Sequence, residues 1–289
     1  MLPSLGRLFG IIFIYSSLCF SPVQAASKGV VKLAYVEWSS EVVSTNIVKA
    51  LLEQADYEVQ IIPTDTLGMW QAVANGKADA TVGAWLDNTQ GQYLNLFGDK
   101  IESLGANLEG TRVGLVVPEY VTIESIEELN TNIDKFGGKI IGIDPGAGVM
   151  GRTVQARHAY ALKNYHLVLS SEVAMTQALS DAVDAKRWIV VTGWVPHWMF
   201  LRWKLKLLKD PKKVYDSNGF IATVVRKGLA QQQPEVYRIL DNFYWSAEEM
   251  QKVMFWNVEN YADPYKTAQR WLKENPERVK QWLEPKLVK

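Results

Sequence analysis

The sequence contains few of the residues that form disulfides, metal centres or nucleophilic active sites. Its 289 residues include one cysteine, Cys19, and three histidines. Cys19 falls in a segment that we expect to be removed, so the remaining chain would form no disulfide. His197 has no second histidine at helical spacing, and no Gly-x-Ser-x-Gly motif occurs. We therefore expect no metal, no cofactor and no enzymatic activity.

An excess of charge of one sign is also absent. Lysine and arginine together number 31, as do aspartate and glutamate, so the formal net charge is zero. A balanced surface gives no electrostatic reason to expect nucleic acid or an anionic membrane as a partner.

Long apolar runs are limited to the N-terminus, where residues 8–20 follow the basic residue Arg7. This stretch is shorter than the roughly 20 residues that span a bilayer. A basic residue, a short apolar core and a small-x-small site are typical of a secretory signal peptide. We predict that residues 1–25 are cleaved off after Ala25 and that the mature protein is periplasmic. Lipidation of Cys19 is the alternative, but a leucine precedes it where lipoprotein signals usually have a small residue.

Tryptophan is abundant, with 11 residues, and two tryptophans end matching units of the chain. The spacing from Trp38 to Trp85 equals that from Gly148 to Trp194 to within one residue. In both units the apolar periodicity predicts the order strand–helix–strand–helix–strand. Two such lobes that face each other form a cleft, and ligands of α/β sheets bind at the carboxyl ends of strands. The repeat predicts an α/β protein of two lobes that holds a small molecule between them.

Two further strands, Thr111–Pro118 and Gly219–Val225, are predicted to connect the lobes. We expect residues 26–115 and 226–289 to form the first lobe and residues 116–225 to form the second. The C-terminal tail should be helical and pack on the first lobe, with helices that begin near Pro234, Ser246, Asp263 and Pro276. Two lobes joined by two strands can hinge around a ligand.

Three tryptophans at predicted strand ends, Trp38, Trp85 and Trp194, are expected to face the cleft. Several indole faces around one cavity attract a cation that has no N–H to donate, and quaternary ammonium suits such a cage best. Tyr120 is a weaker candidate for a fourth wall. The alternative is that these rings only pack against the sheet edges. The tryptophans with helical spacing are predicted to be structural: Trp70, Trp245, Trp256, Trp271 and Trp282.

A glycine-rich turn at residues 143–150 joins a predicted strand to a predicted helix. Free backbone N–H groups and the helix dipole at such a turn bind anions, so Ala147, Gly148 and Val149 are candidates for a carboxylate site. The turn lacks the dinucleotide-binding pattern and the Walker lysine, which argues against a nucleotide. His197 is either a contact of the ligand's polar end or a structural residue.

Five runs in one order carry a family resemblance: Val36-Glu37-Trp38, Gly83-Ala84-Trp85, Val116–Tyr120, Gly142–Gly148 and Thr192–Trp198. In this combination the sequence resembles the glycine betaine/choline substrate-binding proteins of ABC transporters. The resemblance implies a two-lobed type II periplasmic binding fold, with Trp38, Trp85 and Trp194 around a trimethylammonium group. Tyr120 matches a tyrosine of the choline binders, and the amides at Gly148 and Val149 match those that hold a carboxylate. A separate permease and ATPase are the implied partners, and we expect a monomeric receptor.

Two positions depart from that family's patterns. Betaine binders often have Trp-Leu-Pro-x-Thr-His after the first-lobe strand, whereas this chain ends the run with Gln90, which can donate a hydrogen bond but cannot become cationic. Choline binders carry an aspartate two residues after the first cage tryptophan, and here that residue is Ser40. The ligand is therefore open, with glycine betaine first and carnitine, dimethylsulfoniopropionate, trimethylamine oxide or choline behind it.

Two other classes of protein remain as alternatives. A secreted hydrolase could use a tryptophan-lined cleft with Asp79, Asp87 or Asp144 as acid and base. A structural or adaptor protein of the exported compartment would have all its tryptophans in the core and would respond to no small ligand.

Overall fold

The computed structural model describes residues 27–86, 89–215, 219–259 and 261–285. The expected signal peptide, including Cys19 and the cleavage site after Ala25, lies outside the described residues, as does Asp87. Within these ranges, no helix has both the length and the apolar character needed to cross a membrane.

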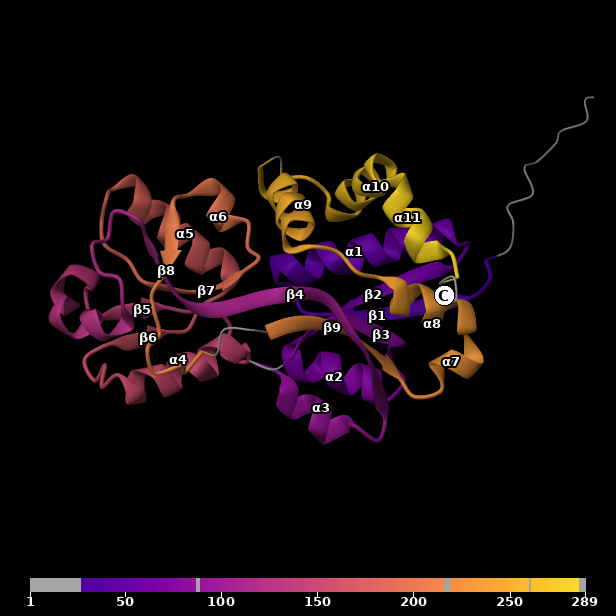
Figure 1. Ribbon diagram of the computed structural model, residues 1–289, viewed down its shortest axis with the longest axis horizontal. Helices are drawn as coiled ribbons and strands as arrows, with labels where there is room; N and C mark the ends of the chain where they lie inside the picture. Colours follow the sequence, from indigo (N-terminus) through magenta and orange to yellow (C-terminus); the bar gives the residue numbers. More distant parts are fainter. Residues whose placement is uncertain (1–26, 87–88, 216–218, 260, 286–289) are drawn as a thin grey trace, which may run out of the picture.

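Nine strands of the described chain form one mixed sheet through both halves of the molecule (Figure 1). Their order is β2-β1-β3-β9-β4-β7-β5-β6, and β8 pairs with β4. The strands are β1 (Val30–Tyr35), β2 (Glu58–Pro63), β3 (Ala80–Leu86), β4 (Ile101–Pro118), β5 (Lys139–Ile141), β6 (His166–Val168), β7 (Val191–Val195), β8 (Leu205–Leu207) and β9 (Gly219–Arg226).

Helices cover both faces of this sheet. They are α1 (Ser39–Gln54), α2 (Thr66–Ala74), α3 (Gly91–Phe97), α4 (Gly148–Ala159), α5 (Glu172–Asp184), α6 (Met199–Arg202), α7 (Leu229–Gln232), α8 (Pro234–Asn242), α9 (Ala247–Glu259), α10 (Pro264–Glu274) and α11 (Pro276–Leu283). Short 3-10 segments follow β4 at Ile126–Thr131 and Ile133–Phe136. In Figure 1, α1 and α9–α11 lie on one side of the right half and α2 and α3 on the other, while α5 and α6 lie opposite α4 in the left half.

The repeated unit predicted from the sequence is present twice, as β1-α1-β2-α2-β3 and β5-α4-β6-α5-β7. In the first copy β1 pairs in parallel with β2 and β3, and in the second β5 pairs in parallel with β6 and β7. Side-chain caps fix two helix starts, because Asp65 accepts the N–H of Gly68 before α2 and Ser171 accepts that of Ala174 before α5. The carboxyl ends of β3 and β7 consequently occupy equivalent places in the two halves.

One strand, β4, belongs to both halves of the sheet. Its residues 101–111 pair with β9, and residues 112–118 pair with β7 and β8. The first part contains three register shifts, which are β-bulges or irregularities, before the strand crosses to the other half. The prediction that residues 111–118 connect the halves is confirmed.

The second predicted crossing strand takes a different place. β9 pairs along its length with β3 and with residues 101–111 of β4, so it is internal to the first half of the sheet. The expected second lobe, residues 116–225, therefore included a strand that pairs elsewhere. We propose instead that the described residues within 27–111 and 219–285 form the first lobe and residues 112–215 the second.

The C-terminal helices pack on the first lobe, as predicted, with α9 and α10 against α1. Their tryptophans form a buried cluster in which the rings of Trp271 and Trp282 stack with centroids 5.4 Å apart, and Trp245 meets Trp271 edge-on at 6.1 Å. These rings and that of Trp70 are buried, which confirms their structural role. Trp256 is half-buried under the charged ends of Lys252 and Arg270.

We predict that Trp271→Ala lowers the free energy of unfolding by about 3–5 kcal/mol, because it leaves a cavity beneath two other tryptophans. Chemical denaturation measures this loss. Tyr261→Ala is the control, since Tyr261 is 97% exposed and its removal should change stability by no more than about 0.5 kcal/mol. A loss below about 1 kcal/mol for Trp271→Ala would contradict the close packing of this cluster.

Candidate ligand-binding site

A small cavity lies where the two lobes meet at the carboxyl ends of β3 and β7. The space open to the centre of a water-sized sphere is about 30 Å³, so the cavity has room only for a compact ligand. The residues that line it come from both lobes: Trp38, Ser40, Trp85, Thr89, Gln90, Val113, Ile143, Ala147, Gly148, Val149 and Trp194.

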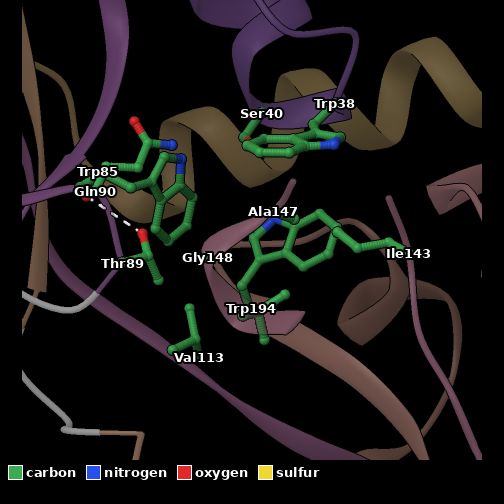
Figure 2. A pocket seen from close by; sticks show the side chains of 11 residues that line it. Trp38, Ser40, Trp85, Thr89, Gln90, Val113, Ile143, Ala147, Gly148 and Trp194 are labelled. Atoms are coloured by element: carbon green, nitrogen blue, oxygen red, sulfur yellow. Dashed lines mark hydrogen bonds between the residues drawn. The ribbon is translucent and has the colours of Figure 1, made fainter. Parts of the chain in front are cut away.

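Three indole rings form the walls of this cavity, as Figure 2 shows with Trp38 above, Trp85 at one side and Trp194 below. Trp38 precedes the first turn of α1, and Trp85 and Trp194 stand near the ends of β3 and β7. Each ring is at most 8% exposed. An arrangement of several ring faces around one space attracts a cation, most strongly one whose methyl groups can contact the rings without needing hydrogen bonds.

Hydrogen bonds at the ring edges fix two of these tryptophans. Trp38 donates its indole N–H to Asp144 of the second lobe at 3.2 Å, and Trp85 donates to Glu41 at 2.5 Å. The indole N–H of Trp194 is buried and has no hydrogen-bond partner among the described residues. In Trp38 and Trp85 the polar edge is thus occupied by the protein, and the ring face is left for the cavity.

The start of α4 supplies hydrogen-bond donors to the cavity. Ala147 precedes the helix without a side-chain cap in the described chain, and the first N–H groups of any helix have no partner within the helix. Gly148 lies against Thr89 of the first lobe so closely that an added Cβ would be 2.1 Å from the Thr89 Cβ. Only glycine lets the helix start approach the other lobe to this distance, and the positive end of the helix dipole faces the cavity.

Gln90 presents a donor to the cavity, because its side-chain orientation is fixed from behind. Trp70 donates its indole N–H to the Gln90 side-chain oxygen at 3.0 Å. An indole nitrogen can only donate, so the amide oxygen must face Trp70 and the NH₂ group must face the other way. In Figure 2 the oxygen of Gln90 points away from the cavity and the nitrogen lies on the opposite side. Sequence reasoning treated Trp70 as structural only and did not foresee this contact.

Glu41 is a buried carboxyl that sequence reasoning missed. One oxygen accepts the Trp85 N–H, and the other is 2.9 Å from the Ser40 hydroxyl, which lines the cavity. Burial raises the pKa of Glu41 to about 8, although the hydrogen bonds from Ser40 and Trp85 oppose that rise. Its place in the sequence, early in an amphipathic helix, gave no signal of this position.

Glu172, at the start of α5, joins the lobes near the cavity. It accepts the backbone N–H of Ser39 from the first lobe at 2.8 Å, and its other oxygen is 3.0 Å from the His197 ring. Burial raises the pKa of Glu172, but the hydrogen bonds from His197 and Ser39 outweigh burial and hold it below its ordinary value. Glu172 is therefore ionised at neutral pH and stabilises the contact between the lobes.

His197 and Tyr120 are not among the residues that line the cavity. His197 is fully buried behind Trp194, with ring centroids 4.6 Å apart, and its Nδ1 accepts the N–H of Met199. Both ring nitrogens thus face protein groups, an arrangement that favours the structural one of the two roles considered for His197. Tyr120 lies in the turn after β4, and it donates its hydroxyl to the carbonyl of Arg187 at 2.7 Å.

The acids expected for a hydrolase do not line the cavity within the described residues. Asp79 accepts hydrogen bonds from Arg226 and from the N–H of Lys32, both at 2.8 Å, at the far end of β3. Asp144 accepts the Trp38 N–H. These two carboxylates hold strands and rings in place.

We predict that Glu172→Gln destabilises the protein by about 1–3 kcal/mol at pH 7, because the variant loses a carboxylate that accepts hydrogen bonds. Since the folded-state pKa is lowered, the stabilisation is present above the unfolded pKa of about 4.5 and disappears as the pH falls through the folded value. Thermal denaturation between pH 3 and 7 should show that the difference in Tm between the wild type and Glu172→Gln becomes smaller below about pH 4.5. A Tm difference that stays constant over this range would contradict the conclusion that Glu172 is ionised in the folded protein. Glu119→Gln is the control, because Glu119 is exposed.

Comparison with known proteins connects this geometry to a family. The sequence profile described as "Substrate binding domain of ABC-type glycine betaine transport system" matches residues 29–274. A glycine betaine/carnitine transport binding protein of Listeria monocytogenes is 48% identical over 147 residues, which is 50% of this chain. The match covers 49% of that relative, so the chain spans about half the length of the curated protein it matches.

Two solved structures are similar over nearly the whole described chain. Lactococcal OpuAC, in its closed-liganded conformation with glycine betaine, has 40% sequence identity and a TM-score of 0.84, and the match covers 89% of this chain and 100% of that one. A glycine/betaine/L-proline-binding protein of Borrelia burgdorferi has 39% identity and a TM-score of 0.85, with coverage of 88% and 97%. Because the family profile spans most of the sequence, the chain belongs to the substrate-binding domains of ABC-type glycine betaine transport systems.

Proposed function

We propose that this protein is an exported receptor that binds a compact quaternary ammonium zwitterion, with glycine betaine as the first choice, and delivers it to an ABC permease. The observation that carries the proposal is the meeting of three indole faces and one uncapped helix start at one small cavity. The rings suit the positive end of such a ligand, and the helix start suits its carboxylate.

Each end of the ligand would contact both lobes. At the positive end, Trp38 and Trp85 come from the first lobe and Trp194 from the second. At the polar end, Gln90 comes from the first lobe and the amides at Gly148 and Val149 from the second. Each cation–π contact contributes about 0.5–2 kcal/mol, depending on how far the pair is removed from water. A ligand that fills the cavity therefore draws the lobes together, and the same contacts favour binding and closure.

The polar end favours a carboxylate over a hydroxyl. The helix start offers N–H groups, and Gln90, fixed by Trp70, offers NH₂. A ligand with an acceptor group, such as glycine betaine, carnitine or dimethylsulfoniopropionate, suits these donors better than choline does, because ionised acceptors form the stronger hydrogen bonds. The name of the Listeria relative also includes both glycine betaine and carnitine.

Export and partners follow from the proposal. The N-terminal sequence supports export through a signal peptide that ends at Ala25, and the family supports a separate permease with its ATPase. We propose that the receptor acts as a monomer and has no catalytic role. Its task is to capture the ligand and present it.

The test is a titration of tryptophan fluorescence with glycine betaine, carnitine, dimethylsulfoniopropionate, choline and trimethylamine oxide. We expect saturable binding, strongest for a carboxylate-bearing ligand. Trp194→Ala should weaken this binding at least tenfold, because it removes one wall of the cage. Trp256→Ala is the matched control, since Trp256 lies on α9 and does not line the cavity. If the folded protein shows no change in fluorescence with any of the five compounds, the proposal is wrong.

We predict that Gly148→Ala weakens binding at least tenfold, because the new methyl group would overlap Thr89 and keep the lobes apart. Calorimetric titration measures the affinity. Gly146→Ala is the control from the same turn, where an added Cβ meets no atom within 4 Å. Equal affinities for the two variants would show that close approach at Gly148 is not needed.

A further inference from the structure

Glu41 is a buried carboxyl directly behind the cage. Its side chain is held on three sides: by the indole N–H of Trp85, by the Ser40 hydroxyl, and by the backbone of Gly83, where an added Cβ would be 2.5 Å from the Glu41 Cγ. Trp85 and Ser40 both line the cavity. Glu41 is therefore separated from the cavity by one ring and one hydroxyl group.

No cation is paired with this carboxyl in the part of the chain that the structure describes. Its hydrogen-bond donors there are the Ser40 hydroxyl, the Trp85 indole N–H and its own backbone N–H. The charged group that acts on it is Glu172, across the lobe boundary, which also disfavours its ionised form, and His197 lies beyond Glu172. Burial together with this like charge keeps Glu41 protonated at neutral pH as long as no cation is near.

We propose that Glu41 is the counter-charge of the cage, and that it releases its proton when a quaternary ammonium group enters the cavity. This inference rests on the proposed function. In the step, the O–H bond of the Glu41 carboxyl breaks, the proton passes to solvent, and the carboxylate remains. The negative charge of the carboxylate then faces the positive charge of the ligand across Trp85.

Ser40 provides a path for the proton, and the resulting carboxylate strengthens the attraction of the Trp85 ring for a cation. The Ser40 hydroxyl can accept a hydrogen bond from the neutral carboxyl and donate one to the carboxylate, and it reaches the cavity. A carboxylate that accepts the Trp85 N–H places negative charge at the ring edge, which increases the attraction of the ring for a cation. The positive charge of the ligand in turn favours ionisation.

Glu41 should favour a ligand with a positively charged group over a ligand of the same shape in which that group is neutral. Glycine betaine and 3,3-dimethylbutanoate have the same outline, but the second carries a carbon atom in place of the positive nitrogen. Glu41→Gln should weaken glycine betaine binding about tenfold and change the binding of 3,3-dimethylbutanoate by less than threefold, because only the first probe gains from a counter-charge. A purely structural role would weaken the binding of both probes alike.

Proton release is measured by calorimetry at pH 7 in two buffers of different ionisation enthalpy. We expect release of more than about half a proton per glycine betaine bound by the wild type and close to none by Glu41→Gln, with Glu119→Gln as an exposed control. Wild-type affinity should rise between about pH 6 and 8, and that of Glu41→Gln should stay flat.

The outcomes separate this inference from the proposed function. Absence of glycine betaine binding by the wild type would overturn both. Binding without proton release, or an equal loss of affinity for both probes in Glu41→Gln, would overturn the inference alone. The wild-type proton count needs no variant, so it decides the question even if Glu41→Gln does not fold.

Discussion

The candidate site depends on the hydrogen bonds that the indole N–H groups of Trp38 and Trp85 make outside the cavity. A buried indole N–H needs an acceptor, and an acceptor inside the cavity would occupy the space between the rings. Trp38 and Trp85 solve this with carboxyl groups behind them, at Asp144 and Glu41. Because Asp144 belongs to the second lobe, the bond that orients Trp38 also joins the lobes. The same constraint explains why Gly83 has no side chain, since the Glu41 stem lies against it.

The parts of the fold that the sequence predicts are those coded by local patterns. Apolar periodicity indicated both βαβαβ units, and the equal spacing of Trp85 and Trp194 within them placed these rings at equivalent strand ends. The uncapped glycine turn before α4 was also visible locally. The strand partners of β9 were not, because a sequence shows where a strand is but not which strands it pairs with.

The supporting contacts of the site could not be predicted for a related reason. The bonds Trp85–Glu41, Ser39–Glu172 and Trp70–Gln90 each join residues that are distant in the sequence. Glu41 and Glu172 stand near helix starts, where acidic residues are common without any further role. For His197 the sequence left two roles open, because closeness to Trp194 along the chain does not show on which side of that tryptophan the ring lies.

The bulged course of β4 bears on how the lobes can move. Each bulge bends and twists a strand locally, and β4 has its register shifts immediately before it enters the second lobe. The strand is also bonded along both parts, to β9 in one lobe and to β7 in the other. A change in the angle between the lobes is therefore spread as small torsions over many hydrogen-bonded residues. Movement between the lobes therefore bends β4 elastically along its length and is not confined to a single hinge residue.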